Sequence, residues 1–117
     1  MRLTKSPKSE TFRVARFHPA LKPILREFPE DVCREVGKAI FDLQRGGLLT
    51  MPLSRPMPVV GRGAHELRVK DRSGAYRVFY MLGANDGVYV FHAFKKTTTA
   101  TPAREIELGK KRLWEMR

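Results

Sequence analysis

The clearest pattern in the chain is a succession of three strand-like runs in its second half. Residues 65–71 alternate apolar and polar side chains with the period of two that is typical of a half-buried strand. Residues 75–82 are rich in aromatic and branched side chains that suit a sheet, and residues 88–94 are almost continuously apolar, which indicates a strand covered on both faces. Turn-forming residues at 71–74 and 83–87 separate the runs. The pattern therefore predicts an antiparallel meander.

The register of this meander determines which side chains share a face. If the first turn is a two-residue loop, Arg68 lies opposite either Arg77 or Phe79. Both registers place Arg68, Lys70 and Arg77 on one face, whereas a three-residue loop would separate them. A second loop of two or four residues adds His92 to the same face. Because like charges directly opposite each other are unfavourable without an anion between them, the pattern predicts a polyanion site.

Helical periodicity dominates the first half of the chain, after a predicted strand at residues 11–17. One apolar stripe has helical spacing and consists of Leu21, Ile24, Leu25 and Phe28. Pro23 must lie in the first turn of this helix, which we therefore expect to start near residues 20–22. A second helix opens after Pro29 and ends at Gly46–Gly47, and its buried stripe is Val32, Val36, Ala39, Ile40 and Leu43. Cys33 lies beside that stripe, where a reduced core thiol is expected rather than a nucleophile.

Three prolines within residues 48–62 exclude a regular helix and argue against a central strand. This segment is expected to be an extended crossover that leaves Arg55 and Arg62 available to partners. In the final helix, Thr101 is predicted as the N-cap and Pro102 as the first helical residue, with an apolar stripe made of Ile106, Leu113 and Met116. The fold class is α+β: a small antiparallel-rich sheet with an N-terminal helical hairpin packed on it and a short C-terminal helix.

A charged run, Lys110, Lys111 and Arg112, interrupts the final helix. It has two interpretations that the sequence leaves open, a solvated helix face and a face that contacts phosphates. Trp114 is expected to anchor this helix rather than to stack on a base.

Composition narrows the class of protein. The chain has 117 residues, which is enough for one domain, expected at residues 11–117 after a flexible basic tail at residues 1–10. With 23 Lys and Arg against 12 Asp and Glu, the formal charge is +11. This excess favours binding to nucleic acid or another anionic surface over the alternative that the basic surface only keeps the protein soluble. A single cysteine excludes an internal disulfide and a cysteine-based metal cluster. No cofactor motif, membrane-length apolar run or secretory signal is apparent, so we expect a cytoplasmic protein without a cofactor.

Three motifs in this order resemble a known family. They are HELRV at residues 65–69, YRVFY at 76–80 and FHAFKKTTTATP at 91–102. Together with the predicted element order, they resemble the phage-derived, HigB-like branch of the RelE superfamily of toxins over residues 11–117. The resemblance implies a RelE-like fold and the toxin of a type II toxin-antitoxin pair. Characterised members cleave mRNA, commonly in the ribosomal A site, so the implied partners are mRNA, the ribosome and a protein antitoxin.

The residues that match the family's functional positions are Arg68 and Arg77 in the first two strands and Lys95 and Lys96 after the third. Metal-free RNA cleavage needs a base for the 2′-hydroxyl, stabilisation of extra charge on the phosphate, and an acid for the leaving oxygen. Arginine suits the second task because its planar fork binds phosphate oxygens and stays ionised. Lys70 is expected to add positive charge beside these groups.

The acid and the base have several candidates. His92 is predicted on the basic face, and an unperturbed histidine exchanges a proton near neutrality, but a lone histidine in an apolar strand is more often part of the core. Tyr76 and Tyr80 are candidates to donate protons or stack on a base, although aromatic strand residues are usually core. Glu66 is either a general base or an ion-pair partner that positions the arginines. The residues predicted to contact RNA are Lys70, Arg55, Arg62, Tyr76, Lys110, Lys111 and Arg112.

Two other functional classes fit the same pattern. One is a binding module that grips RNA, DNA or the ribosome without cutting, because a fold does not fix a function. The other is a phage accessory or assembly protein with a basic surface.

Overall fold

A computed structural model of the chain describes residues 12–83 and 87–117. The predicted basic tail, residues 1–10, and the middle of the second predicted turn lie outside the described residues. The elements in chain order are β1 (Val14–Phe17), α2 (Leu21–Arg26), α3 (Glu30–Gln44), β2 (Ser54–Pro56), β3 (Ala64–Asp71), β4 (Gly74–Leu82), β5 (Gly87–Lys96) and α4 (Ala103–Glu115).

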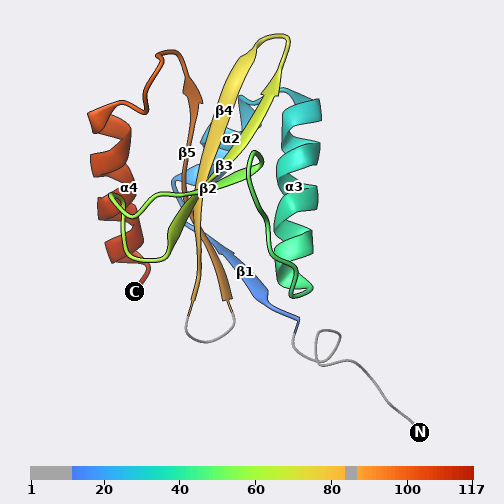
Figure 1. The fold of residues 1–117 in the computed structure, drawn as a ribbon, viewed down its shortest axis with the longest axis vertical. Coiled ribbons are helices and arrows are strands. Elements are labelled where there is room, and N and C mark those ends of the chain that lie inside the picture. The colour runs from blue at the N-terminus through green and yellow to red at the C-terminus, as the bar shows by residue number, and fades with distance from the viewer. Residues whose placement is uncertain (1–11, 84–86) are drawn as a thin grey trace, which may run out of the picture.

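The five strands form one mixed sheet in the order β1-β5-β4-β3-β2. Strand β1 runs parallel to β5, and the remaining neighbours are antiparallel. Figure 1 shows α3 on one side of this sheet and α4 on the other. Each face has its own apolar core, one beneath α2 and α3 and the other beneath α4. The predicted α+β class is confirmed.

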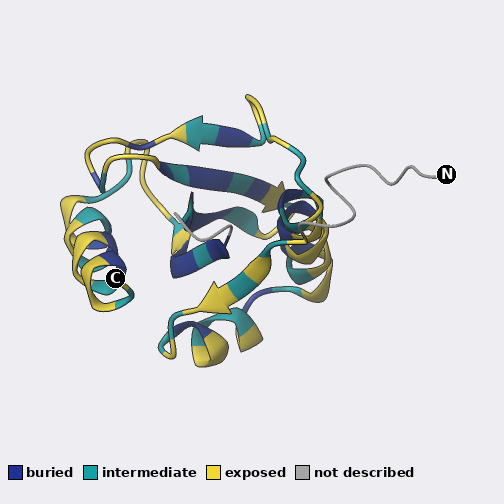
Figure 2. Ribbon diagram, turned by 90° about the horizontal axis from the view of Figure 1, so that it is seen from below, coloured by how far each residue is buried: buried dark blue, intermediate teal, exposed yellow. Residues whose placement is uncertain are grey.

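The helical hairpin follows the predicted stripes. Helix α2 begins at Leu21 and holds Pro23 in its first turn, where the missing N–H has no intrahelical partner to lose. In α3 the buried positions are Val32, Val36, Ala39, Ile40 and Leu43, as predicted. Figure 2 shows the consequence, because buried residues concentrate on the strands and on the helix faces turned toward them.

The meander has one of the two expected registers at Arg68, and it brings His92 to the expected place by a different route, through a β-bulge rather than through a second loop of two or four residues. Asp71 pairs with Gly74, so the first loop consists of two residues, and its backbone is held by Asp71 Oδ1, which accepts from Ser73 N at 2.8 Å. Arg68 consequently lies opposite Arg77. His92 lies opposite Phe79, next to a β-bulge at Phe79 and Tyr80.

The remaining segments differ from expectation at three positions. The crossover contains the short strand β2, which pairs at the edge of the sheet with β3. Pro102 rather than Thr101 is the N-cap of α4, and no side chain caps that end, because the Thr101 hydroxyl donates to Glu66 instead. Trp114 is 77% exposed, so the prediction that it anchors α4 is wrong, and Leu113, 3% exposed, takes that place.

None of the helices in the described residues has the length and apolarity needed to cross a membrane.

Candidate functional site

A fully buried carboxylate gathers three arginines on the α4 face of the sheet. Glu66 in β3 is 0% exposed. Its Oε1 lies 3.2 Å from Nη2 of Arg55, 3.6 Å from Nε of Arg77 and 4.0 Å from Nε of Arg68. Its Oε2 accepts a hydrogen bond of 2.9 Å from Thr101 Oγ1. The cluster thus joins β2, β3, β4 and the residue that precedes α4.

The sheet register explains why these side chains meet. Arg55 pairs with Glu66 across β2 and β3, and Arg68 pairs with Arg77 across β3 and β4. Because side chains two residues apart on a strand share a face, Glu66 and Arg68 point to the same side, and their cross-strand partners follow them. Lys70 continues that row toward the end of β3.

The cluster carries excess positive charge in a buried place. Three guanidinium groups against one carboxylate leave two positive charges uncompensated. Burial is the main cause that lowers the pKa of Arg77, and the neighbouring Arg68 and Arg55 lower it further, whereas Glu66 acts in the opposite direction. Among the described residues, the buried Nε atoms of all three arginines lack a hydrogen-bond partner. The excess positive charge of the guanidinium groups suits an anion.

A cavity opens beside the cluster. Its volume is about 390 Å³, and Arg68, Lys70 and Arg77 contribute its cationic lining. Pro52, Leu53, Val69 and Ala75 supply the rest of the wall. The three cationic residues that the strand pattern placed on one face therefore line one cavity, of a size that accepts a nucleotide-sized ligand.

The two lysines at the end of β5 lie on different sides of the sheet. Lys96 pairs with Ala75 on the side of Arg77, and its Nζ donates to the carbonyl oxygens of Thr98 and Thr99 at 2.6 Å each. Lys95 pairs with Tyr76, and its Nζ lies 5.8 Å from the centre of that ring. The expectation that both lysines border the basic face is therefore wrong for Lys95, because successive residues in a strand alternate between faces.

His92 is held by two side chains of α4. Its Nε2 lies 2.7 Å from Glu105 Oε1, and its Nδ1 lies 2.7 Å from Nη1 of Arg112. A guanidinium can only donate, so Nδ1 must be the acceptor, which fixes a neutral ring that donates from Nε2 to Glu105. Burial chiefly lowers the pKa of His92, although Glu105 opposes that shift. Both ring nitrogens are engaged, which favours the core interpretation of His92 over a proton-transfer role, and Arg112 is likewise engaged within the molecule.

The other predicted RNA contacts are dispersed. Tyr76 is 4% exposed on the α2 and α3 face, where its ring lies 4.8 Å from that of Phe28, so it is turned away from the basic cavity and unable to stack on a base there. Arg62 is exposed in the turn before β3, at the opposite end of that strand from Lys70. Lys110 and Lys111 are exposed on α4.

Sequence reasoning missed the role of Thr101, and it left Glu66 ambiguous. The signal for Glu66 was present, because strand alternation places it on the same face as Arg68. The link to Thr101 had no such signal, since the two residues are 35 positions apart and the hydroxyl had an obvious alternative as a helix cap.

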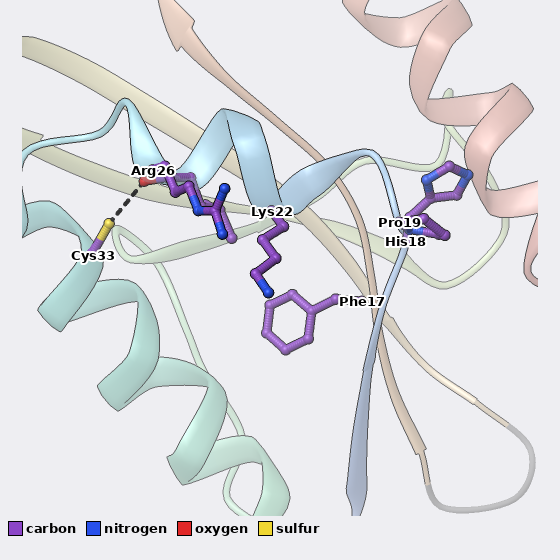
Figure 3. A pocket seen from close by; sticks show the side chains of 7 residues that line it. Phe17, His18, Pro19, Lys22, Arg26 and Cys33 are labelled. Atoms are coloured by element: carbon purple, nitrogen blue, oxygen red, sulfur yellow. Dashed lines mark hydrogen bonds between the residues drawn. The ribbon is translucent and has the colours of Figure 1, made fainter.

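A second cavity lies on the other face, between β1 and α2. Its volume is about 800 Å³. Figure 3 shows the side chains that line it. Phe17, Leu25 and Cys33 form much of its apolar lining, while Lys22 and Arg26 stand beside it. The Cys33 thiol donates to the carbonyl oxygen of Leu25 at 3.2 Å. Cys33 is therefore half-buried in a cavity wall rather than in the closed core that the sequence predicted.

Residues 24–114 match the family described as Phage derived protein Gp49-like (DUF891). The chain belongs to this Gp49-like family. It is a RelE/toxin-like family, and the matched residues include α3, strands β2 to β5 and the whole Glu66 cluster. No curated protein matches the chain.

Proposed function

We propose that this Gp49-like protein is the toxin of a type II toxin-antitoxin system that cleaves mRNA on the ribosome without a metal ion and is silenced by a protein antitoxin. The observation that carries the proposal is the convergence of Arg55, Arg68 and Arg77 on one buried carboxylate beside a cavity that Lys70 also lines. A cationic cavity of this kind is suited to one backbone phosphate and its neighbouring nucleotides.

In this proposal the arginines stabilise the charge that develops on the phosphate when the 2′-hydroxyl attacks it. Arg68, whose side chain is 31% exposed, reaches the cavity from β3 and is suited to bind phosphate oxygens directly. Arg77, 9% exposed, contributes from a drier position where its charge is less screened by water. Removal of one such donor from an enzyme typically lowers the rate by about 100- to 1,000-fold.

Glu66 is best interpreted as the group that positions the arginines. Its carboxylate is completely buried, and it already faces three guanidinium groups and one hydroxyl donor. A proton acceptor must reach the 2′-hydroxyl of the RNA, which a fully enclosed carboxylate cannot do without displacing these partners. Glu66 therefore acts through Arg68 and Arg77.

The direct test is induction of the wild-type protein and of variants in growing cells, followed by growth measurement and primer extension on translated mRNA. We expect growth arrest and new mRNA 5′ ends with the wild type, and about 100-fold less cleavage with Arg77→Ala and with Arg68→Ala. Two variants are needed because Arg77 is buried and its loss can also lower stability. Arg34→Ala is the matched control, since its side chain is 66% exposed on α3.

The outcomes separate the functional classes. Unimpaired growth with every transcript intact at high expression would overturn the proposal. In that case, salt-sensitive RNA binding would indicate a non-catalytic binding module, and its absence would favour an accessory or assembly role.

A further inference from the structure

Exposed aromatic side chains lie near both ends of β1 and on the neighbouring helix α3. Phe12 is 50% exposed, Phe17 is 45% exposed and Phe41 of α3 is 48% exposed. The rings of Phe12 and Phe41 lie 6.0 Å apart, so α3 and the start of β1 share one apolar surface. Contiguous exposed apolar surface of this kind is typical of protein interaction sites.

The apolar cavity of about 800 Å³ lies at the other end of β1, where Phe17 is part of its lining. Phe17, labelled in Figure 3, offers contacts to an aliphatic or aromatic side chain. Leu25 also lines the cavity and adds to these contacts. Lys22 and Arg26 are exposed on α2 at the same cavity. The chemistry of the site therefore combines an apolar interior with two cations beside it, which differs from the arginine-lined cavity near Glu66.

The backbone of β1 adds a third feature. In the sheet that the described residues form, β1 is an edge strand, and its single neighbour is β5. An edge strand presents N–H and C=O groups that an additional strand can pair with. Here such groups are available only beyond Arg13, whose N–H and C=O are bonded to Gln44 at the end of α3. Nucleic acid cannot use this pairing, whereas a polypeptide can.

We propose that the β1 edge and the adjacent cavity form a docking surface for an acidic, extended segment of a partner protein. The segment pairs with β1, places one apolar side chain in the cavity and directs carboxylates toward Lys22 and Arg26. Charge complementarity supports an acidic partner, because the chain has a formal charge of +11 and both charged residues that line this cavity are cations. The inference does not rest on RNA cleavage, since β1 lies at the opposite edge of the sheet from β2, which carries Arg55.

The chain contains two natural reporters for a test with the full-length protein. Its single cysteine, Cys33, lines the cavity, and its single tryptophan, Trp114, is exposed on α4 across the sheet. The probe is a synthetic peptide of alternating Glu and Val with one central Phe. We expect this peptide to slow the reaction of Cys33 with a thiol reagent at least about tenfold when bound, because an occupied cavity excludes the reagent, while the emission of Trp114 stays unchanged.

Variants of the protein locate the binding site. Lys22→Glu with Arg26→Glu is expected to weaken peptide binding about tenfold through lost charge pairing, and Phe17→Ser to do so through lost apolar contact. The double variant Lys110→Glu and Lys111→Glu makes the same change of net charge on α4, and we expect its affinity to stay within about twofold of wild type.

Control probes test the chemistry of the partner. A peptide with Lys in place of Glu, and one with prolines that remove strand-pairing N–H groups, should bind at least about tenfold more weakly. Equal binding of the Lys peptide, an equal loss in the α4 double variant, or binding that leaves Cys33 fully reactive would overturn the proposal. Protection of Cys33 by an RNA oligonucleotide or by anionic vesicles, in place of the acidic peptide, would overturn it as well.

Discussion

At the scale of single residues, Glu66 holds the cationic cluster together. A carboxylate that is 0% exposed is stable there because three arginines and Thr101 surround it. Burial of an ion pair contributes little net stability, but loss of one partner leaves the other charges uncompensated.

Glu66→Gln is therefore expected to lower the free energy of unfolding by about 3 kcal/mol and to weaken RNA binding at the same time. Urea denaturation and RNA titration measure the two effects. Glu107→Gln on the exposed side of α4 is the control, and its stability should match that of wild type. A Glu66→Gln protein as stable as wild type would show that the arginines do not depend on this carboxylate.

His92 makes the free energy of unfolding depend on pH. Burial lowers its pKa below the ordinary 6.5, so the unfolded chain binds a proton at a pH where the folded protein still does not. The stabilisation is fully present above about pH 6.5 and is lost as the pH falls through the folded pKa. Glu105, Arg112 and His18 are the charged or titratable groups that influence the ring.

We expect the unfolding free energy of wild type to fall below pH 6.5 more steeply than that of His92→Gln, by up to about 1.4 kcal/mol per pH unit. Urea denaturation between pH 7.5 and pH 5 (about the range in which an ordinary histidine titrates) provides the comparison. Parallel curves for the two proteins would contradict the assignment of the neutral, buried ring.

At the scale of elements, α4 approaches the sheet unusually closely at Gly109. A Cβ atom there would lie 2.7 Å from Cδ2 of Phe79 and 3.3 Å from Cγ1 of Val60. Gly37 in α3 is the matched opposite, because a Cβ atom there would meet nothing within 4 Å.

These two glycines predict opposite results for the same substitution. Gly37→Ala should stabilise the protein by about 0.5–1 kcal/mol, since alanine favours the helix. Gly109→Ala should destabilise it by about 1–3 kcal/mol despite the same gain in propensity, because α4 must move away from Phe79. Thermal and urea unfolding of the pair measure both changes. Stabilisation by Gly109→Ala would contradict the close packing of α4.

Elements with a strong local pattern were predictable from the sequence. The α3 stripe followed from helical periodicity, and a two-residue turn was enough to place Arg68 and Arg77 on one face, although it left open whether Arg77 or Phe79 lies opposite Arg68. The failures have different physical causes, and only that of Thr101 depends on a contact distant in sequence. Thr101 bonds Glu66 instead of capping α4, Trp114 faces solvent, and Lys95 faces away from the cluster. In the candidate site, pattern could group the arginines, but it could not bring Arg55 to them without the pairing of β2 with β3.

At the scale of the whole molecule, the cations behind the formal charge of +11 differ in how strongly salt screens them. Many cations, such as those on α2 and α4, are exposed and screened by salt, whereas in the cluster at Glu66 the carboxylate and Arg77 are buried and Arg55 and Arg68 are partly exposed. Binding of RNA should therefore combine a salt-sensitive general attraction with a local contribution from the cavity.

We expect the logarithm of the RNA affinity to fall linearly with the logarithm of the salt concentration, and Lys70→Gln to reduce the magnitude of that slope by about 1. Lys38→Gln is the control, because Lys38 is 79% exposed on α3 on the other side of the sheet. A slope that is equally reduced in both variants would indicate diffuse attraction without a defined phosphate contact.

The β-bulge at Phe79 and Tyr80 determines which side chains at the end of β5 lie on the same face as the arginines. Phe79 pairs with His92 and Tyr80 with Val90, so β5 contains one residue more than β4 at this point. Beyond the bulge, the alternation of β5 side chains between the two faces of the sheet is therefore reversed. In an unbulged strand of the same sequence, Lys95 would take the place opposite Ala75 that Lys96 occupies. A one-residue insertion beyond the bulge would exchange the two lysines between opposite surfaces without altering any other residue. The number of residues in β5, as much as their type, thus determines whether Lys95 or Lys96 lies on the same face as the arginines.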